Sequence, residues 1–234
     1  MGLTALVARK ATDYRDPHSI ASRIRKRRLA PLVRLIEGCR AKHGRVRILD
    51  LGGTEEYWGL LPDAVLDAND VEVTLVNVPG SRPPAAGGRF HFVEGDACDL
   101  SRFPDGAFDI VHSNSVIEHV GDWPRMVAFA REVRRLAPSY FVQTPNFWFP
   151  MEPHWMVPAF HWLPAPVRVQ MFMRFDLGHA RRSDTVGAAV LLVEHARLLD
   201  RRMFKFLFPD AQHITERLLG MAKSLVAIRQ DGTP

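Results

Sequence analysis

Apolar residues recur at the spacing of a helix near the start of the chain. The positions that share this spacing are Ile20, Ile24, Leu29, Leu32, Val33 and Ile36. Residues three and four apart share one face of a helix, so the pattern predicts a helix over residues 18–38. Pro31 lies inside this stretch, and proline fits the first turn of a helix but not its interior, so we expect it to break or restart the helix. Residues 1–17 show little periodicity and are expected to be loosely ordered.

Short β-branched and aliphatic runs alternate with helical patterns through the middle of the chain. The runs that predict strands are residues 46–51, 71–78, 90–93, 108–112 and 140–143. Between them, helical spacing predicts a short helix around residues 55–67, disturbed by Pro62, and a longer helix over residues 123–136. Strands that alternate with helices are typical of a mostly parallel sheet that is covered on both faces.

The alternation stops after the fifth predicted strand. Six prolines punctuate residues 144–177, a segment rich in Phe, Trp and Met, so this segment cannot form one long helix. Ser183 or Asp184 is then predicted to cap a helix that runs on to Leu198.

The end of the chain predicts two more strands. Residues 203–208 and 224–228 fit this pattern, and residues 210–220 would join them. A terminal pair of strands departs from a plain dinucleotide-binding fold. The expected organisation is a single domain over residues 1–234, with an N-terminal helical segment at 18–44, a core at 45–143, an aromatic insertion at 144–180 and a C-terminal helix with the final strands at 181–234.

Composition is that of a folded globular protein. The chain has 234 residues, of which 47% are hydrophobic and 24% are charged, enough for one well-buried domain. No window approaches the roughly 18 consecutive apolar residues that a membrane-spanning helix needs, and the first residues do not resemble a signal peptide. Cys39 and Cys98 form no C-x-x-C pair, so the sequence predicts a cytoplasmic protein in a reducing environment.

The net charge of +5 gives two interpretations. Basic clusters, of which residues 23–28 are the longest, could attract phosphates, anionic lipid or an acidic substrate. They could instead be solvated helix faces, which is the interpretation that we favour. Because aromatic residues are not interleaved with the basic ones, the sequence disfavours nucleic acid as a partner.

A turn with two glycines follows the first predicted strand. The strand ends at Asp50 and Leu51, and Gly52, Gly53 and Thr54 come next. Glycine lets the backbone adopt positive φ and approach a ligand closely, and ligands of open α/β sheets lie at the carboxyl ends of the strands. The turn therefore indicates either a ligand site or an ordinary strand-to-helix connection.

Three stretches together resemble a known family. They are residues 48–54 (ILDLGGT), 94–97 (EGDA) and 108–120 (FDIVHSNSVIEHV). Their order and content are similar to the class I S-adenosylmethionine-dependent methyltransferases, and in particular to the small-molecule enzymes of the type 11-like kind. The resemblance covers residues 45–145 by motif and 200–230 by pattern. It implies a Rossmann-like, seven-stranded α/β sheet that is mostly parallel, with an antiparallel last strand.

The resemblance also implies how S-adenosylmethionine would be held. The residues implicated are Asp50, Gly52, Gly53, Asn77, Asp96, Ala97 and Asn114. Asp50 would orient the glycine turn and contact the methionine amino group directly or through water, while the glycines would let the backbone pass beneath the methionine and ribose portions. Asp96 would accept a hydrogen bond from the adenine amino group, beside a backbone N–H of Ala97. Asn114 would lie near the methionine end and the substrate.

Two positions depart from the family pattern. Many members have a third glycine in the first turn, where this chain has Glu55, Glu56 and Tyr57. The ribose diol is usually met by a carboxylate, and Asn77 stands there instead. An amide accepts hydrogen bonds less strongly than a carboxylate, so we expect a loss of about 1 kcal/mol or more of cofactor affinity unless Glu55 or Glu56 compensates.

Candidate chemistry beyond the cofactor is limited. His119 is the leading candidate for a general base, because histidine titrates near neutral pH; alternatively, it is a helix-start residue bonded to a neighbouring carbonyl. His154 and His161 are seven residues apart across Pro158, and no metal-ligand spacing is present, so no metal site is predicted. The absence of G-x-S-x-G and Walker motifs argues against hydrolase and nucleotidase chemistry.

The aromatic insertion is the expected place of substrate specificity. Trp148, Phe149, His154 and Trp155 are the candidate substrate-binding residues. They predict a small acceptor that is apolar or aromatic, and a lipid-linked molecule fits as well. The alternatives are a satellite core or an oligomer interface, which leaves a homodimer open.

These observations favour transfer of a methyl group from S-adenosylmethionine to O, N or C of a small molecule. A non-catalytic S-adenosylmethionine-binding or scaffold protein is the main alternative. A nicotinamide-dependent dehydrogenase is a weaker one, since no G-x-G-x-x-G follows the first predicted strand.

Overall fold

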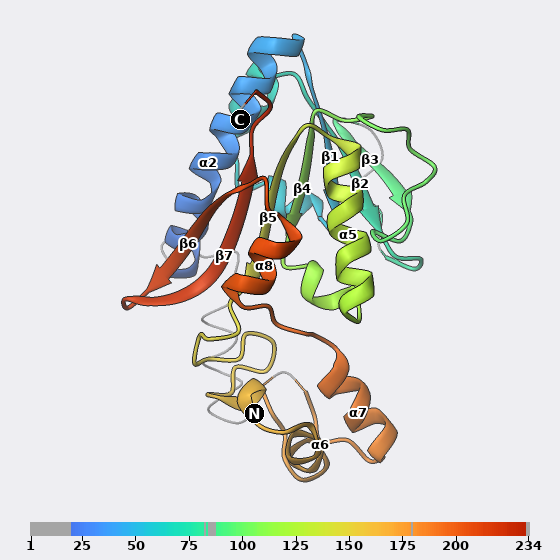
Figure 1. Ribbon diagram of the computed structural model, residues 1–234, viewed down its shortest axis with the longest axis vertical. Helices are drawn as coiled ribbons and strands as arrows, with labels where there is room; N and C mark the ends of the chain where they lie inside the picture. Colours follow the sequence, from blue (N-terminus) through green and yellow to red (C-terminus); the bar gives the residue numbers. More distant parts are fainter. Residues whose placement is uncertain (1–19, 82, 84–87, 179, 233–234) are drawn as a thin grey trace.

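The computed structural model describes residues 20–81, 83, 88–178 and 180–232, and a seven-stranded sheet forms its centre (Figure 1). The strands are β1 (Val46–Leu51), β2 (Val71–Asn77), β3 (Phe90–Glu94), β4 (Ile110–Asn114), β5 (Ser139–Pro145), β6 (Gln212–Leu218) and β7 (Met221–Arg229). They lie in the order β3-β2-β1-β4-β5-β7-β6. Strands β1 to β5 pair in parallel, and β7 pairs antiparallel with both β5 and β6. The predicted fold class is therefore confirmed, while residues 1–17, expected to be loosely ordered, lie outside the described residues.

Alternate residues of β1 face two separate hydrophobic cores. Ile48 packs in a core with residues of three helices, α2 (Ile20–His43), α3 (Glu55–Trp58) and α4 (Asp63–Ala68). Leu49 packs on the opposite face with α5 (Trp123–Leu136) and α8 (Arg201–Leu207). Successive side chains of a strand point to opposite faces, so this division makes a three-layer arrangement with helices on both sides of the sheet (Figure 1).

Helix α2 continues through Pro31, so the predicted break is wrong. Proline removes one backbone hydrogen bond from a helix interior, at a cost of about 3 kcal/mol. Leu32, Leu35 and Ile36 follow within two turns and are almost completely buried against the sheet. Each buried aliphatic side chain contributes about 1.5–3 kcal/mol, so their burial outweighs the proline.

Most of the predicted elements form with small shifts. The predicted helix over residues 123–136 is observed with those bounds, and the Asp122 carboxylate caps it by accepting a hydrogen bond from the Arg125 N–H at 3.1 Å. The predicted strand at 108–112 begins two residues later, at Ile110. Asp109 is instead fixed before the strand, because its carboxylate accepts hydrogen bonds from the backbone and the guanidinium of Arg47.

The C-terminal prediction is wrong in one element. Residues 203–208 belong mostly to helix α8, and the two final strands are β6 and β7. The carboxylate of Asp200 caps this helix by accepting hydrogen bonds from two backbone N–H groups at its start. Helical winding then buries Phe204, Leu207 and Phe208 together while Phe206 stays exposed. An apolar run of this length suits either a strand or a buried helix face, and the cap together with the burial favours the helix.

The aromatic insertion forms a small helical lobe beyond the carboxyl end of β5 (Figure 1). It contains η2 (Phe160–Trp162), α6 (Ala165–Arg174) and α7 (Val186–Glu194). Phe160, Phe172, Ala189 and Val193 form a core of its own. The lobe therefore extends past residue 180, where the predicted insertion ended. Thr185, rather than Ser183 or Asp184, caps α7, and this helix ends at Glu194, so Leu198 lies outside it.

Candidate functional site

The turn after β1 forms the floor of a cavity of about 360 Å³. Gly52, Gly53 and Thr54 line it together with residues of α3 and the end of β4. Gly52 has a φ of +70°, and a Cβ there would lie 2.5 Å from a methyl group of Val116. A Cβ at Gly53 would lie 1.7 Å from Asp50 Oδ2. The turn therefore requires glycine at both positions for steric reasons.

Asp50 supports this turn from within the core. Its side chain has no exposed surface. Oδ2 accepts a hydrogen bond from the Trp58 indole N–H at 2.7 Å, and Oδ1 lies 2.7 Å from His112 Nδ1. The other ring nitrogen of His112, Nε2, lies 3.2 Å from the Tyr57 hydroxyl oxygen. The contacts with Trp58 and His112 fix the carboxylate beside the glycine turn, and Asp50 also lines the cavity.

Asn77, the last residue of β2, holds the same turn in place through a side-chain hydrogen bond. Its Nδ2 donates a hydrogen bond to the carbonyl oxygen of Gly53 at 2.9 Å. A carboxylate has no hydrogen to donate, so it could not make this contact. The structure therefore explains why an amide stands at position 77: it donates the hydrogen bond that holds the glycine turn. The sequence pattern did not indicate this role.

Asp96 and Ala97 follow the end of β3. The Asp96 carboxylate accepts hydrogen bonds from the Arg125 guanidinium at 2.8 and 2.9 Å and from the Cys98 backbone N–H at 2.9 Å. Partial burial acts to raise the pKa of Asp96, but these hydrogen bonds outweigh it, and the pKa lies below its usual value. Roughly half of each side chain in the Asp96–Arg125 ion pair is exposed.

The chain turns sharply after β4. Asn114, the last residue of this strand, lines the glycine-turn cavity. Ser115 has a positive φ of 58°, which is uncommon for a residue other than glycine. Its backbone N–H and hydroxyl both donate hydrogen bonds to Gln143 of β5. This turn leads directly into η1 (Ile117–His119).

His119 lies in a network of partly buried side chains and does not line the glycine-turn cavity. Its Nδ1 is 2.9 Å from the carbonyl oxygen of His195, and its Nε2 is 3.1 Å from His154 Nε2. His154 Nδ1 is 2.7 Å from a carboxylate oxygen of Glu152. Burial lowers the pKa of His119 to about 4, which opposes a role as a proton acceptor near neutral pH. Its assignment as general base stays a prediction.

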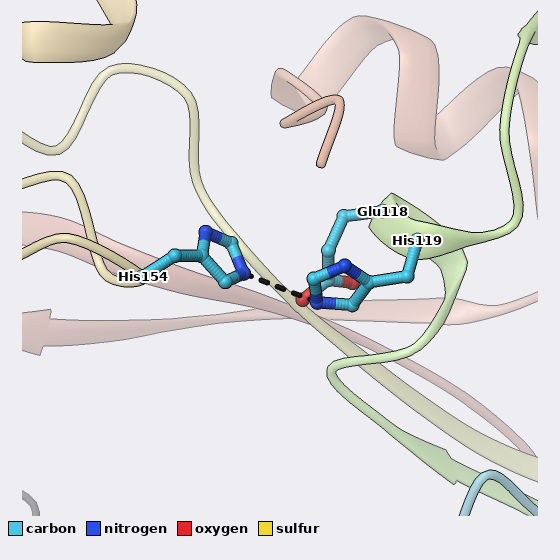
Figure 2. A group of neighbouring side chains, drawn as sticks. All are labelled: Glu118, His119 and His154. Atoms are coloured by element: carbon cyan, nitrogen blue, oxygen red, sulfur yellow. Dashed lines mark hydrogen bonds between the residues drawn. The ribbon is translucent and has the colours of Figure 1, made fainter. Parts of the chain in front are cut away.

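Glu118 completes this group from the same short helix. Its side chain is fully buried, Oε2 accepts a hydrogen bond from the Thr144 hydroxyl at 3.0 Å, and Oε1 has no hydrogen-bond partner among the described residues. Burial raises the pKa of this carboxyl to about 7. Within the described part of the chain, Glu118, His119 and His154 are the group whose ligand atoms lie close enough to hold a metal ion, all within 4.8 Å of one another (Figure 2).

The helical lobe contains a second cavity, of about 330 Å³. Phe147, Trp155 and Phe160 form aromatic walls, and His161 and Arg168 contribute polar groups. Of the four residues predicted to bind substrate, Trp155 alone lines this cavity: Trp148 is 64% exposed, Phe149 is half-buried, and His154 faces His119. Their roles as substrate contacts stay predictions.

Sequence reasoning missed several residues of these sites. His112 lies in one motif and Trp58 follows another, but neither residue carries a signal that it would hold Asp50. Arg168 lies in a segment without periodicity, and its contacts depend on how the lobe folds.

Residues 53–139 match the family model described as a methyltransferase domain. They span α3 to the start of β5 and include Gly53, α3 and the end of β4, which line the glycine-turn cavity. This match confirms the resemblance to the class I S-adenosylmethionine-dependent methyltransferases that the sequence indicated.

Solved structures agree with the fold of this methyltransferase domain. An O-methyltransferase family protein from Burkholderia thailandensis matches with a TM-score of 0.51 at 17% identity over 91% of this chain. A SAM-dependent methyltransferase from Archaeoglobus fulgidus matches with a TM-score of 0.52 at 16% identity, over 88% of this chain and 93% of that chain. This chain spans only 58% of the length of the Burkholderia protein. The comparison with curated proteins gives no match.

The residues of the methyltransferase domain fit S-adenosylmethionine. The cavity over the two glycines is within the usual range of small-molecule sites, about 300–1,000 Å³. Its floor is backbone without a Cβ, which permits close approach of the methionine and ribose portions. No described helix combines the length and the apolar character needed to cross a membrane.

Proposed function

We propose that this chain transfers the methyl group of S-adenosylmethionine to an oxygen, nitrogen or carbon atom of a small acceptor with an apolar or aromatic body. The observation that carries the proposal is the cavity over Gly52 and Gly53, at the carboxyl ends of the strands of a methyltransferase domain. Ligands of open α/β sheets bind at this edge.

Seven residues around this cavity and beside it would hold the cofactor. They are Asp50, Gly52, Gly53, Asn77, Asp96, Ala97 and Asn114. When bound, the cofactor would supply an electrophilic methyl carbon, with a sulfonium sulfur that can keep the electron pair of the carbon–sulfur bond. The protein contributes mainly alignment of the two reactants, which can supply roughly 7–11 kcal/mol of the barrier.

Asp96 remains available to the adenine amino group despite its ion pair. Each carboxylate oxygen has two lone pairs, so Asp96 can accept a further hydrogen bond while Arg125 stays in place. An ion pair of this exposure is worth about 1 kcal/mol or less, so Arg125 can also move aside at little cost.

The cavity in the lobe supports the acceptor class. His161 Nε2 lies 2.7 Å from the Phe147 carbonyl oxygen and so carries the hydrogen, which leaves a buried lone pair on Nδ1 without a partner in the described part of the chain. Among the same described residues, the buried Arg168 Nε–H has no acceptor. An acceptor with a hydroxyl for His161, an anionic or carbonyl oxygen for Arg168 and an aromatic ring against Trp155 would satisfy all three. Hydroxylated aromatic acids are therefore the first class to screen.

The volume of this cavity favours a free aromatic molecule over a long lipid-linked one. The cytoplasmic location and a homodimer stay predictions.

Calorimetric titration with S-adenosylhomocysteine tests the cofactor site. We expect micromolar binding by the wild-type protein and a clear loss of affinity in Asp96→Ala. Asp105→Ala is the matched control, because Asp105 is also an exposed aspartate paired with an arginine, Arg135, but it precedes β4, whereas Asp96 follows the carboxyl end of β3. Absence of binding at millimolar ligand, or equal losses in both variants, would refute this site.

Methyl transfer is tested with radiolabelled S-adenosylmethionine and a panel of hydroxylated aromatic acids. Labelled product that depends on the panel compound supports the proposed activity. Tight cofactor binding without transfer to any acceptor would favour the non-catalytic alternative.

A further inference from the structure

Two histidines meet through atoms that should repel each other. His119 Nδ1 faces a backbone carbonyl oxygen, that of His195, and a carbonyl only accepts, so Nδ1 carries the hydrogen. His154 Nδ1 faces the Glu152 carboxylate and carries its hydrogen for the same reason. Each Nε2 is then left with a lone pair, and these two atoms lie 3.1 Å apart (Figure 2). The contact is repulsive unless a cation lies at it.

The Glu152 carboxylate is held in place to receive that hydrogen. Its side chain is 5% exposed, and its second oxygen accepts a hydrogen bond from the Trp155 backbone N–H at 2.6 Å. The ring of His154 is therefore oriented by a buried, fixed acceptor, and the ring of His119 by a backbone carbonyl. Histidines that bind metals nearly always donate their other N–H to a carboxylate or a backbone carbonyl in this way.

A third ligand lies beside the two nitrogens. Glu118 comes from the same short helix as His119, and the Glu118 and His119 side chains both point toward His154 in Figure 2. One of its oxygens, Oε1, is buried without any partner among the described residues. Burying a carboxylate oxygen without a hydrogen bond or a cation costs about 1–3 kcal/mol or more of folding free energy. A cation beside Glu118 Oε1 would remove this cost.

We propose that Glu118, His119 and His154 bind one divalent transition-metal ion of the zinc class. Zinc–nitrogen bonds of about 2.0–2.1 Å place two ligand nitrogens of a tetrahedral ion roughly 3.3 Å apart, close to the observed 3.1 Å. The carboxylate oxygen, within 4.8 Å of both nitrogens, closes the set by a small rotation of the Glu118 side chain. Three protein ligands leave the fourth tetrahedral position open, as in catalytic zinc sites.

A proton shared between the two Nε2 atoms is the competing explanation. It would remove the repulsion between the histidines, but it would leave Glu118 Oε1 without a partner. A metal ion satisfies all three atoms at once. The proposal concerns binding alone and does not depend on methyl transfer.

The full-length protein, stripped of metal with a chelator, is titrated with Zn²⁺ by calorimetry and with Co²⁺ by visible absorption. We expect one Zn²⁺ per chain with micromolar affinity or tighter, and the intense ligand-field bands of tetrahedral Co²⁺. His154→Gln should abolish both signals. Glu152→Gln removes the negative charge and leaves one oxygen for the two N–H groups, of His154 and Trp155, that the carboxylate accepts from, so it should weaken Zn²⁺ binding by about 10–100-fold.

His213→Gln is the matched control. His213 is also a half-buried histidine with one ring nitrogen on a backbone carbonyl, that of Phe208, and it lies in β6 outside the three-residue group. It should leave both titrations unchanged. Titration of His154→Gln with S-adenosylhomocysteine shows whether the variant is folded, and it separates failure of the metal site from failure of the cofactor site.

Two results would overturn the proposal. One is a wild-type protein that shows neither Zn²⁺ binding nor Co²⁺ bands at millimolar metal, which would leave the shared proton as the explanation. The other is binding that survives in a folded His154→Gln variant, which would place the ion elsewhere in the chain.

Discussion

Replacement of Gly53 by alanine should damage both the core and the glycine turn. The added Cβ would lie 1.7 Å from Asp50 Oδ2, which is closer than any non-bonded contact, so one of the two groups must move. Asp50 cannot move freely, because the Trp58 indole and the His112 ring hold its two oxygens at 2.7 Å each. A compensating shift of Asp50 would break these contacts inside the core, since Asp50 and Trp58 have no exposed surface.

The magnitude follows from the contacts that are lost. Displacement of Oδ2 leaves the Trp58 N–H buried without a partner and weakens a hydrogen bond to a carboxylate, each worth about 1–3 kcal/mol. We therefore expect the free energy of unfolding to fall by about 3 kcal/mol. For a chain of this size that corresponds to a decrease in Tm of about 6–12 °C.

Urea unfolding and thermal melts measure this effect, with Gly59→Ala as the matched control. Gly59 has a φ of −63°, and the nearest heavy atom to a Cβ there is 3.5 Å away, an ordinary contact. The control should change stability by about 0.5 kcal/mol or less. If Gly53→Ala unfolds with a free energy like that of the control, Asp50 is not locked as the structure indicates, and the steric reasoning fails.

Three further predictions concern the turn, the lobe and the buried carboxyl. Asn77→Asp removes the hydrogen bond to the Gly53 carbonyl and places two oxygens against each other. The affinity for S-adenosylhomocysteine should therefore fall about tenfold, and tighter binding in calorimetry would contradict this expectation. Trp155→Ala should weaken acceptor binding while the affinity for S-adenosylhomocysteine stays the same, and loss of both would indicate a purely structural role. Thr144→Val removes the hydrogen bond to the buried Glu118 carboxylate and should lower the free energy of unfolding by about 1–3 kcal/mol, measured by urea unfolding; an unchanged value would mean that this contact contributes nothing.

The core strands and helix α5 could be predicted because their signals are local. Residues 46–51 form β1 and residues 123–136 form α5, as their spacing indicated. In both elements the apolar residues that set the period are also the residues that pack in the cores. A capping aspartate, Asp122, adds a second local signal at the start of α5.

The C-terminal run was ambiguous for a physical reason. Residues 203–208 are apolar at nearly every position, so they carry neither the period of a strand nor that of a helix. Packing of Phe204, Leu207 and Phe208 in the core shared with α5 decides the outcome.

The sequence by itself determined the class of sheet, the glycine turn and the residues that follow β3 and β4. Each of these depends on residues adjacent in the chain, where steric and hydrogen-bonding preferences act over a few positions. Tertiary structure alone decided that Asp50 contacts Trp58 and His112. It also decided that Asn77 donates a hydrogen bond to the glycine turn. It also brought His154 to His119, 35 residues away in sequence, because the lobe folds back over the end of β4 and no local pattern encodes that contact.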